Sequence, residues 1–210
     1  MLNLENRVKY AKKYKRYIKM LGEVKYADWD SSNNVNKEIK ESIKQQLLRR
    51  QNGLCVYCEL KLMETSRPEV EHIAPRNKYP KFQYISKNLA VACQFCNGSS
   101  KKGNKDVIAS PDSYYNKCVF TIVHPYYDNV SHFFDNSGHI IKINAGLSSV
   151  EEEKARNTIS IFGLDDPNYI EARQKAKLWD EMKSAAGACN MSMEMLIEDV
   201  QKYLWSRRSL

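Results

Sequence analysis

Apolar residues recur every three or four positions near the start of the chain, and this spacing predicts an amphipathic helix. The stripe has lysine and arginine on its other faces and consists of Leu4, Val8, Ala11, Tyr14, Ile18 and Leu21. After a polar break at residues 31–36, a second helical pattern places Ile39, Ile43 and Leu47 on one face. Residues 1–52 are therefore predicted to form a basic helical region.

Two short apolar segments in the middle of the chain predict strands. The first covers residues 69–74 and stops at Pro75, and the second covers residues 88–92. A long loop of polar and aromatic residues separates them, and a turn or short helix is expected to open at Asn97. The order strand, loop, strand and helix is typical of an α+β unit, which we place at residues 53–112.

The last part of the chain changes from a strand pattern to a helical pattern. Residues 119–124 and 139–143 read as strands, with a turn signal at 135–138, and predict a hairpin or small meander. Helical signals follow: Ser149 and Glu152 have the spacing of a capping box, and Gly163 is a predicted C-cap. Pro167 stands at the first position of a further helix. The last helix is predicted to bury Leu196, Val200 and Leu204. Residues 113–210 are predicted to hold a β-hairpin and a C-terminal helical region.

The charge of the chain narrows the choice of partners. The formal net charge over 210 residues is +8, and residues 1–22 hold seven basic side chains against Glu5 alone. Such an excess indicates a polyanionic partner without identifying it, and a solvated helix face is the commoner role of a basic helix. Because we find no apolar leader and no segment long enough to span a bilayer, we expect a cytoplasmic protein without a membrane partner.

Four of the six cysteines form two Cys-x-x-Cys pairs, made by Cys55, Cys58, Cys93 and Cys96. In a cytosolic protein, cysteines at this spacing are more often metal ligands than disulfides. Four thiolates complete a closed tetrahedral site, so we expect structural Zn²⁺ here. Reactive thiols are the alternative, which two matched pairs disfavour. The other two, Cys118 and Cys189, are predicted to be buried neutral thiols.

Four further polar residues near these pairs are not needed by a zinc ion. A histidine with an ordinary pKa of about 6.5 can deprotonate water, so His72 is a candidate general base. Glu71 and Asn97 offer the oxygen ligands that suit Mg²⁺, and Asn88 is placed to tie the loop to the strand through backbone hydrogen bonds. Adjacent strand residues point to opposite faces, so Glu71 and His72 share a site only if the chain bends there, as Pro75 favours.

The complete motif consists of Cys55-x2-Cys58, Glu71-His72-Ile73-x-Pro75-Arg76, Asn88-Leu89 and Cys93-x2-Cys96-Asn97, followed by Lys101-Lys102-Gly103. It resembles the HNH endonucleases with a zinc-stapled ββα-metal fold. The resemblance implies a phosphodiester hydrolase in which His72 is the general base, Asn88 holds the loop, and Glu71 and Asn97 bind the catalytic metal. Glu stands at position 71 where Asp is commoner, and Asn at position 97 where His is also common, which favours Mg²⁺ or Mn²⁺ over zinc as that metal.

A narrower resemblance rests on Cys-x-Tyr-Cys-Glu at residues 55–59 and on His-Pro-Tyr-Tyr-Asp at residues 124–128. These segments are similar to the HNH subunits of Septu-type and retron-associated antiphage systems. The resemblance implies a nuclease effector that degrades DNA on phage infection and works beside an ABC-type ATPase. Two alternatives stay open: a free-standing or phage-encoded restriction-type HNH nuclease, and a non-catalytic zinc-stabilised nucleic-acid-binding module.

Two cations near the motif are candidate substrate-binding residues, Arg76 and Lys102. Contacts to phosphate dominate the affinity of proteins for nucleic acid, and cations beside the scissile bond would supply them. A solvated charged face is the alternative for both.

Overall fold

The computed structural model describes residues 1–63, 66–188 and 191–207, and in the last helix it describes side chains as far as Lys202. The predicted α+β class is confirmed, since helices alternate with small two-stranded sheets. The α-helices are α1 (Lys12–Met20), α2 (Asn34–Arg50), α3 (Gln94–Asn97), α4 (Val130–Phe133), α5 (Ser149–Phe162), α6 (Pro167–Ala188) and α7 (Met193–Arg207). The strands are β1 (Pro68–His72), β2 (Leu89–Cys93), β3 (Ile108–Ser110), β4 (Val119–Phe120), β5 (Phe134–Asp135) and β6 (Lys142–Ile143). Short 3₁₀ helices are η1 (Tyr26–Asp30), η2 (Pro80–Phe82), η3 (Ser86–Asn88) and η4 (Tyr115–Lys117).

The first helix is shorter than its apolar stripe predicts. Residues 1–11 have no regular structure, and α1 begins only at Lys12. The backbone of the first residues binds remote segments instead, as where the N–H of Leu4 donates to the carbonyl of Pro125 at 2.7 Å. Leu4 and Val8 are still buried in the core. The apolar residues of this segment are therefore buried although the segment itself is not helical.

The second helix is confirmed and supports the middle of the molecule. Ile39, Ile43 and Leu47 on α2 are completely buried, and the helix packs against both β1 and β2. Gln51 follows the helix directly, and its side-chain amide makes hydrogen bonds to both the N–H and the carbonyl of Val91 in β2. The position of β2 is thus fixed from α2.

The two strands predicted in the middle of the chain are confirmed and pair with each other in an antiparallel ribbon. Pro68 lies opposite Cys93 at one end of the ribbon, and His72 lies opposite Leu89 at the other. The short helix α3 begins directly after Cys93. One end of the ribbon therefore carries the second cysteine pair, and the other end carries the Glu-His pair.

The hairpin expected between residues 119–124 and 139–143 is wrong. The strand β4 pairs with β3, which precedes it in the chain, and β6 pairs with β5. Pro125 and α4 interrupt the chain between the expected partners, so each strand pairs with a nearer segment. A hairpin does form in the C-terminal part, between β5 and β6.

The helix α5 starts one residue earlier than its capping signal predicts. The capping box uses Ser148 and Glu151, with the Ser148 N–H donating to the Glu151 carboxylate at 2.9 Å. The predicted C-cap at Gly163 is confirmed, since this residue has φ of 58° in the left-handed region. Glycine adopts that region without the steric cost that a Cβ atom brings.

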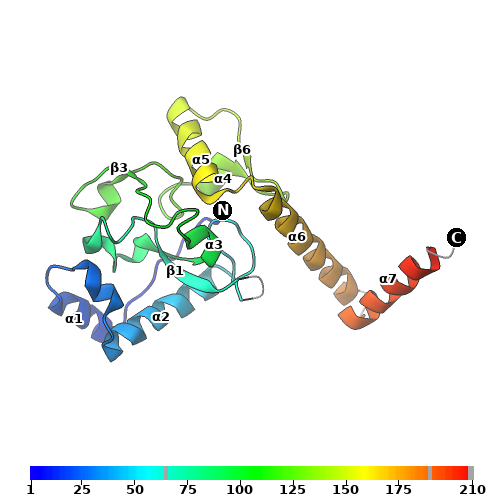
Figure 1. Cartoon of the computed structure of the whole chain (residues 1–210), viewed down its shortest axis with the longest axis horizontal. Helices are drawn as coiled ribbons and strands as arrows, with labels where there is room; N and C mark the ends of the chain where they lie inside the picture. Colours follow the sequence, from blue (N-terminus) through cyan, green and yellow to red (C-terminus); the bar gives the residue numbers. More distant parts are fainter. Residues whose placement is uncertain (64–65, 189–190, 208–210) are drawn as a thin grey trace.

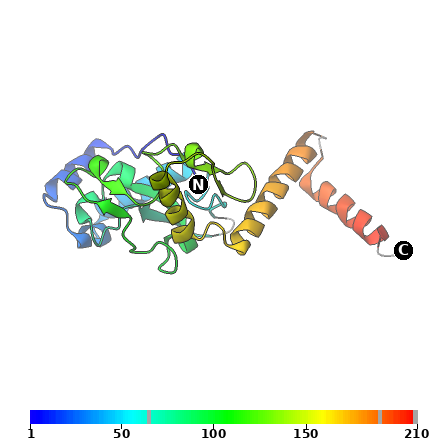
Figure 2. The same ribbon diagram turned by 90° about the horizontal axis from the view of Figure 1, so that it is seen from above.

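The helices α6 and α7 extend away from the rest of the chain in both views (Figure 1, Figure 2). Pro167 opens α6 as predicted. The burial predicted for the last helix is wrong for Val200, which is 40% exposed because α7 has little to pack against. Leu196 is half-buried, and the side chain of Leu204 lies outside the described residues. No helix in the described ranges combines the length and the apolar character needed to cross a membrane.

Candidate functional site

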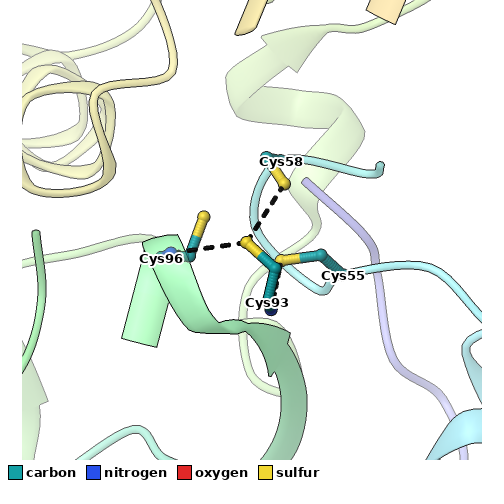
Figure 3. Close-up of side chains that lie close together, drawn as sticks. All are labelled: Cys55, Cys58, Cys93 and Cys96. Atoms are coloured by element: carbon teal, nitrogen blue, oxygen red, sulfur yellow. Dashed lines mark hydrogen bonds between the residues drawn. The ribbon is translucent and has the colours of Figure 1, made fainter. Parts of the chain in front are cut away.

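The four cysteines predicted to bind zinc meet in one buried cluster (Figure 3). The four sulfur atoms all lie within 4.8 Å of one another, and they belong to Cys55, Cys58, Cys93 and Cys96. The first pair comes from the loop between α2 and β1, whereas the second pair spans the junction of β2 and α3. Backbone N–H groups of Cys93 and Cys96 donate to the sulfurs of Cys55 and Cys93, at 3.3 and 3.4 Å. These donors stabilise thiolates, which are the form that binds a metal.

The chemistry of this cluster fits a tetrahedral metal ion such as zinc. Hydrogen bonding with Cys55 lowers the pKa of Cys93 far below its usual range and raises the pKa of Cys96 far above it. Four thiolates this close would repel one another, so all four ionise together only around a cation. Outside the cluster, Cys118 is a buried free thiol as predicted, and Cys189 lies outside the described residues.

His72, the predicted general base, lies at the end of β1 and is 7% exposed. Its Nε2 lies 3.1 Å from the backbone carbonyl of Gln83. A carbonyl only accepts hydrogen bonds, so Nε2 carries the proton in the neutral ring and Nδ1 is the basic nitrogen. Burial, aided by the charge of Arg76, lowers the pKa of His72 to about 3, so the ring is neutral at physiological pH.

Trp29 lies at this site although no motif or spacing in the sequence indicates it. Its ring meets the imidazole of His72 edge to face, with centroids 4.4 Å apart and an interplanar angle of 83°. Trp29 lies in η1 and is 7% exposed, and its carbonyl accepts hydrogen bonds from the side chains of Asn36 and Lys40 on α2. The side of the imidazole is thus fixed from a segment about forty positions earlier in the chain.

Asn88 makes the backbone contacts that its position suggests. It is completely buried, and its Oδ1 accepts from the N–H of Ala74 at 2.6 Å. Its Nδ2 donates to the carbonyls of Ala74 and Phe82, at 3.3 and 3.0 Å. Phe82 precedes Gln83, whose carbonyl holds His72. Asn88 therefore fixes the loop that orients the imidazole.

Glu71 is buried in a polar contact that links the two ends of the ribbon. Its Oε1 accepts a hydrogen bond from the hydroxyl of Tyr57 at 3.1 Å and lies 3.0 Å from the ammonium of Lys102. Tyr57 stands inside the first cysteine pair and stacks on Phe162 of α5 with centroids 3.6 Å apart. Burial raises the pKa of the Glu71 carboxyl, and the charge of Lys102 opposes this. A tyrosine within Cys-x-x-Cys was visible in the sequence, but its partner was not.

Lys102 occupies a different environment from the one expected for a phosphate ligand. The residue is 1% exposed, and besides Glu71 its ammonium binds the carbonyl of His72 at 2.9 Å. This geometry pairs the charge of Lys102 with the carboxylate of Glu71. Contact with substrate stays a prediction for this residue.

Arg76, the other predicted substrate ligand, lies at the edge of the site. Its guanidinium pairs with the carboxylate of Asp30 at 2.8 Å and lies over the ring of Tyr26 at 4.3 Å. The side chain remains 22% exposed. Arg76 therefore joins η1 to the segment after β1 while its charge still reaches the surface.

A cavity of about 350 Å³ brings most of the predicted residues together, and its lining includes Glu71, His72, Arg76, Asn97 and Lys102. Glu71 and His72 both line this cavity although they are neighbours on a strand. The chain bends directly after them, at residues 73 and 74. The Nδ2 of Asn97 donates a hydrogen bond to the carboxylate of Glu69 at 2.8 Å. This contact leaves the Oδ1 of Asn97 as a possible metal ligand. The oxygen atoms of Glu71 and Asn97 fit a hard cation such as Mg²⁺, which would share the Glu71 carboxylate with Lys102.

Comparison with known proteins identifies relatives of this chain. A Septu protein PtuB of Bacillus thuringiensis is 34% identical over 127 residues, which cover 60% of this chain and 42% of that protein. A second Septu protein PtuB, from Bacillus mycoides (strain KBAB4), is 27% identical over 163 residues, or 68% of this chain and 53% of that protein. A Vibrio cholerae protein named "Retron Vc95 putative HNH endonuclease" is 28% identical over 169 residues, or 76% of this chain and 74% of that protein.

These matches extend over different shares of the relatives. The chain spans about half the length of the two PtuB proteins and about three quarters of the retron protein. No family model matches the chain. The resemblance read from the sequence motif is confirmed by these relatives: the chain is a homologue of Septu PtuB proteins and of the protein named "Retron Vc95 putative HNH endonuclease".

Proposed function

We propose that this protein is a metal-dependent HNH endonuclease that hydrolyses DNA phosphodiester bonds as the nuclease effector of an antiphage system. The observation that carries the proposal is the arrangement of His72. Its Nε2 is bound to the Gln83 carbonyl, and its ring lines a polar cavity that also contains Glu71 and Asn97. A neutral imidazole held in one tautomer beside oxygen ligands is what a hydrolytic site requires.

In the proposed reaction, the Nδ1 atom of His72 accepts a proton from the attacking water. The Gln83 carbonyl keeps the other nitrogen protonated, and Trp29 prevents the ring from turning. No other hydrogen bond to this imidazole occurs within the described part of the chain. The ring is therefore oriented by contacts that leave its basic nitrogen available.

The phosphodiester requires positive charge on its oxygen atoms as the bond breaks. Glu71 and Asn97 would hold a Mg²⁺ or Mn²⁺ ion, which would supply positive charge to the phosphodiester. Arg76 offers a further positive charge at the edge of the cavity, because its guanidinium is partly exposed. Lys102 balances the buried charge of Glu71.

In this proposal β1, β2 and α3 form the ββα-metal module of residues 53–112, and zinc on the four cysteines holds the module without joining the reaction. Support comes from the cysteine cluster at the end of the same ribbon that carries His72. The flanking regions, residues 1–52 and 113–210, are proposed to serve the assembly, apart from Trp29, which orients the ring of His72. The Septu relatives support a partner, for which we propose an ABC-type ATPase.

A plasmid-cleavage assay with Mg²⁺ or Mn²⁺ tests the proposal. Wild type is compared with His72→Ala at equal zinc content, and the control is His132→Ala, which removes an exposed imidazole that pairs with Glu151. We expect cleavage to disappear in His72→Ala and to persist in the control. Loss of a general base typically lowers a rate by about 10²- to 10⁴-fold.

The possible outcomes separate the alternatives. Equal cleavage by wild type and His72→Ala would contradict the proposed base. If wild type cleaves only after an ATPase partner is added, and His72→Ala does not, the chain is an effector that is silent alone. If neither protein cleaves in any assembly, while both bind DNA with zinc present, the chain is a binding module.

A further inference from the structure

A second concave surface lies on the other side of the loop that holds His72. It is a groove with a volume of about 640 Å³, within the range of about 300–1,000 Å³ that is usual for ligand pockets. Its walls come from the segment before α1, the loop from η2 to η3 and the segment around η4. None of its lining residues is a ligand of the cysteine cluster or of the proposed catalytic metal.

The charged side chains that line this groove are all basic. They are Arg7, Lys81 and Lys87, and no aspartate or glutamate is among the lining residues within the described chain. The acidic residue Asp112 lies beside the groove, where its carboxylate accepts from the N–H of Tyr114 at 2.8 Å and its backbone carbonyl accepts from Lys81. The groove is therefore suited to a ligand with several negative charges.

Aromatic rings alternate with these cations. The side chains of Tyr114 and Tyr127 are 64% and 37% exposed, so both rings are accessible from the groove. The ammonium of Lys87 lies 4.5 Å from the centre of the Tyr127 ring. Exposed rings beside cations are the combination on which unpaired bases stack while their phosphates are neutralised.

The groove and the catalytic cavity share one wall. Phe82 and Tyr84 line the groove, and Gln83 between them supplies the carbonyl that holds His72 on the opposite side. Asn88 anchors the same loop through the Phe82 carbonyl. A strand that enters the catalytic cavity can therefore continue into the groove around a single short segment.

We propose that this groove is a binding site for single-stranded nucleic acid, with phosphates at Arg7, Lys81 and Lys87 and bases stacked on Tyr114 and Tyr127. A paired duplex satisfies only the cations, because its bases are already stacked on each other. The exposed rings are what favour an unpaired strand. The binding does not depend on hydrolysis at His72, so this proposal and the proposed function fail separately.

The test measures binding by fluorescence anisotropy, with a labelled oligothymidylate and a duplex of equal length as probes. The protein is the zinc-loaded chain of 210 residues with His72→Ala and without added Mg²⁺, so that cleavage cannot distort the binding curve. Two groove variants are added to this background, Tyr114→Ala and the pair Lys81→Ala with Lys87→Ala. The matched control removes two lysines from α6, Lys175 and Lys183, which lie outside the groove.

The groove predicts three results. Tyr114→Ala weakens binding of the single strand about fivefold or more. Tyr114→Phe does not, because phenylalanine keeps an aromatic ring on which a base can stack. The double lysine variant lowers the slope of log K against log salt by about 1.4, because each lost phosphate contact on a single strand contributes about 0.7. The α6 control binds as the parent does.

Other results would overturn the proposal. Binding of the single strand that is unchanged in both groove variants removes the site. A duplex bound more tightly than the single strand, or an equal loss in Tyr114→Ala for both probes, removes the stacking. An α6 control as weak as the double lysine variant shows a general charge effect. Thermal melts of each variant verify folding, which the exposure of Lys81 and Tyr114 favours.

Discussion

The two ends of the β1–β2 ribbon hold polar groups in opposite ways. At the end of Cys93, four identical thiols face each other in a closed buried cluster. At the end of His72, groups of different chemistry line a cavity of about 350 Å³ that reaches the surface beside Arg76. The first end fits a metal with no position left for a substrate, and the second leaves room for one.

The difference shows how one small ribbon can serve both stability and chemistry. The closed end needs only its own ligands, which lie in two tight pairs along the chain. The open end needs support from outside, and receives it from Trp29, from the Gln83 carbonyl and from the amide of Asn88. Substitutions at the closed end should therefore affect the whole fold, whereas those at the open end should affect the reaction.

The largest effect is expected from Cys58→Ser. Binding of a structural zinc ion contributes on the order of 10 kcal/mol in small zinc domains, so loss of one of four ligands should lower Tm by roughly 10 °C or more. Cleavage should fall with the folded fraction, because His72 lies on the same ribbon. Zinc content by mass spectrometry and Tm by circular dichroism measure both effects.

The control for this substitution is Cys118→Ser, which changes a buried thiol outside the cluster. It should retain zinc at the wild-type level. If Cys58→Ser kept its zinc and its Tm, the cluster would not be a structural metal site, and the contrast between the two ends would lose its basis.

The next effect comes from a matched pair of buried amides, Asn88 and Gln51. Each makes three hydrogen bonds to backbone groups, Asn88 at the open end and Gln51 near the closed end. Substitution of either by Ala should lower the free energy of unfolding by about 2–3 kcal/mol, because buried backbone groups lose their partners. Only Asn88→Ala should also slow cleavage by the folded protein. We expect a rate lower by about tenfold or more, because the loop that orients His72 loses its anchor and the imidazole is displaced. Equal cleavage rates for the two folded variants would show that Asn88 does not position His72.

The closed end could be predicted from the sequence because its information is local. Two pairs of cysteines at fixed spacing specify both the ligands and their geometry, and the strands between them have short apolar runs of the right length. The stripe at Ile39, Ile43 and Leu47 was equally informative, since a continuous buried face needs no knowledge of its partner. The helix predicted from Leu4 and Val8 does not form, because the backbone there makes hydrogen bonds to remote segments instead of helical ones.

The open end could be predicted only in part. His72, Glu71 and Asn97 stand out by type and position, but the groups that orient them do not. Gln83 acts through its backbone carbonyl, which any residue carries, and Trp29 arrives from η1 about forty positions earlier. The buried position of Lys102 was equally hidden, because a lysine in a polar segment is usually exposed.

A pH experiment sharpens the comparison with a histidine that lies at neither end. His124 is completely buried, with hydrogen bonds to the hydroxyl of Tyr115 and the N–H of Tyr126 and with the charges of Lys154 and Lys87 nearby. Burial lowers the pKa of His124 well below its usual value, whereas an unfolded histidine takes up a proton at a pH of about 6.5. Below that pH the unfolded chain holds the extra proton, so the free energy of unfolding should fall with acid, by up to about 1.4 kcal/mol per pH unit for this group.

Urea denaturation between pH 7 and pH 5 measures this slope in wild type and in His124→Gln. The variant should have a slope that is smaller by up to one proton, with cleavage by the folded protein unchanged. The exposed His132 provides the matched surface substitution, His132→Gln. An unchanged slope in His124→Gln would show that this imidazole does not remain neutral in the fold.

The smallest effect tests a contact between the two ends, the hydrogen bond from Tyr57 to Glu71. Tyr57→Phe keeps the ring that stacks on Phe162 and removes only the hydroxyl, so the cost in stability should be about 1 kcal/mol. Because Glu71 loses a donor that fixes its carboxylate, half-maximal cleavage should need a severalfold higher concentration of Mn²⁺, and titration calorimetry should show weaker Mn²⁺ binding. The control is Tyr126→Phe, which removes a hydroxyl bound to the Leu89 carbonyl on the same ribbon. If both variants bind Mn²⁺ alike, the closed end supports the open end only through the backbone, and Tyr57 contributes to packing alone.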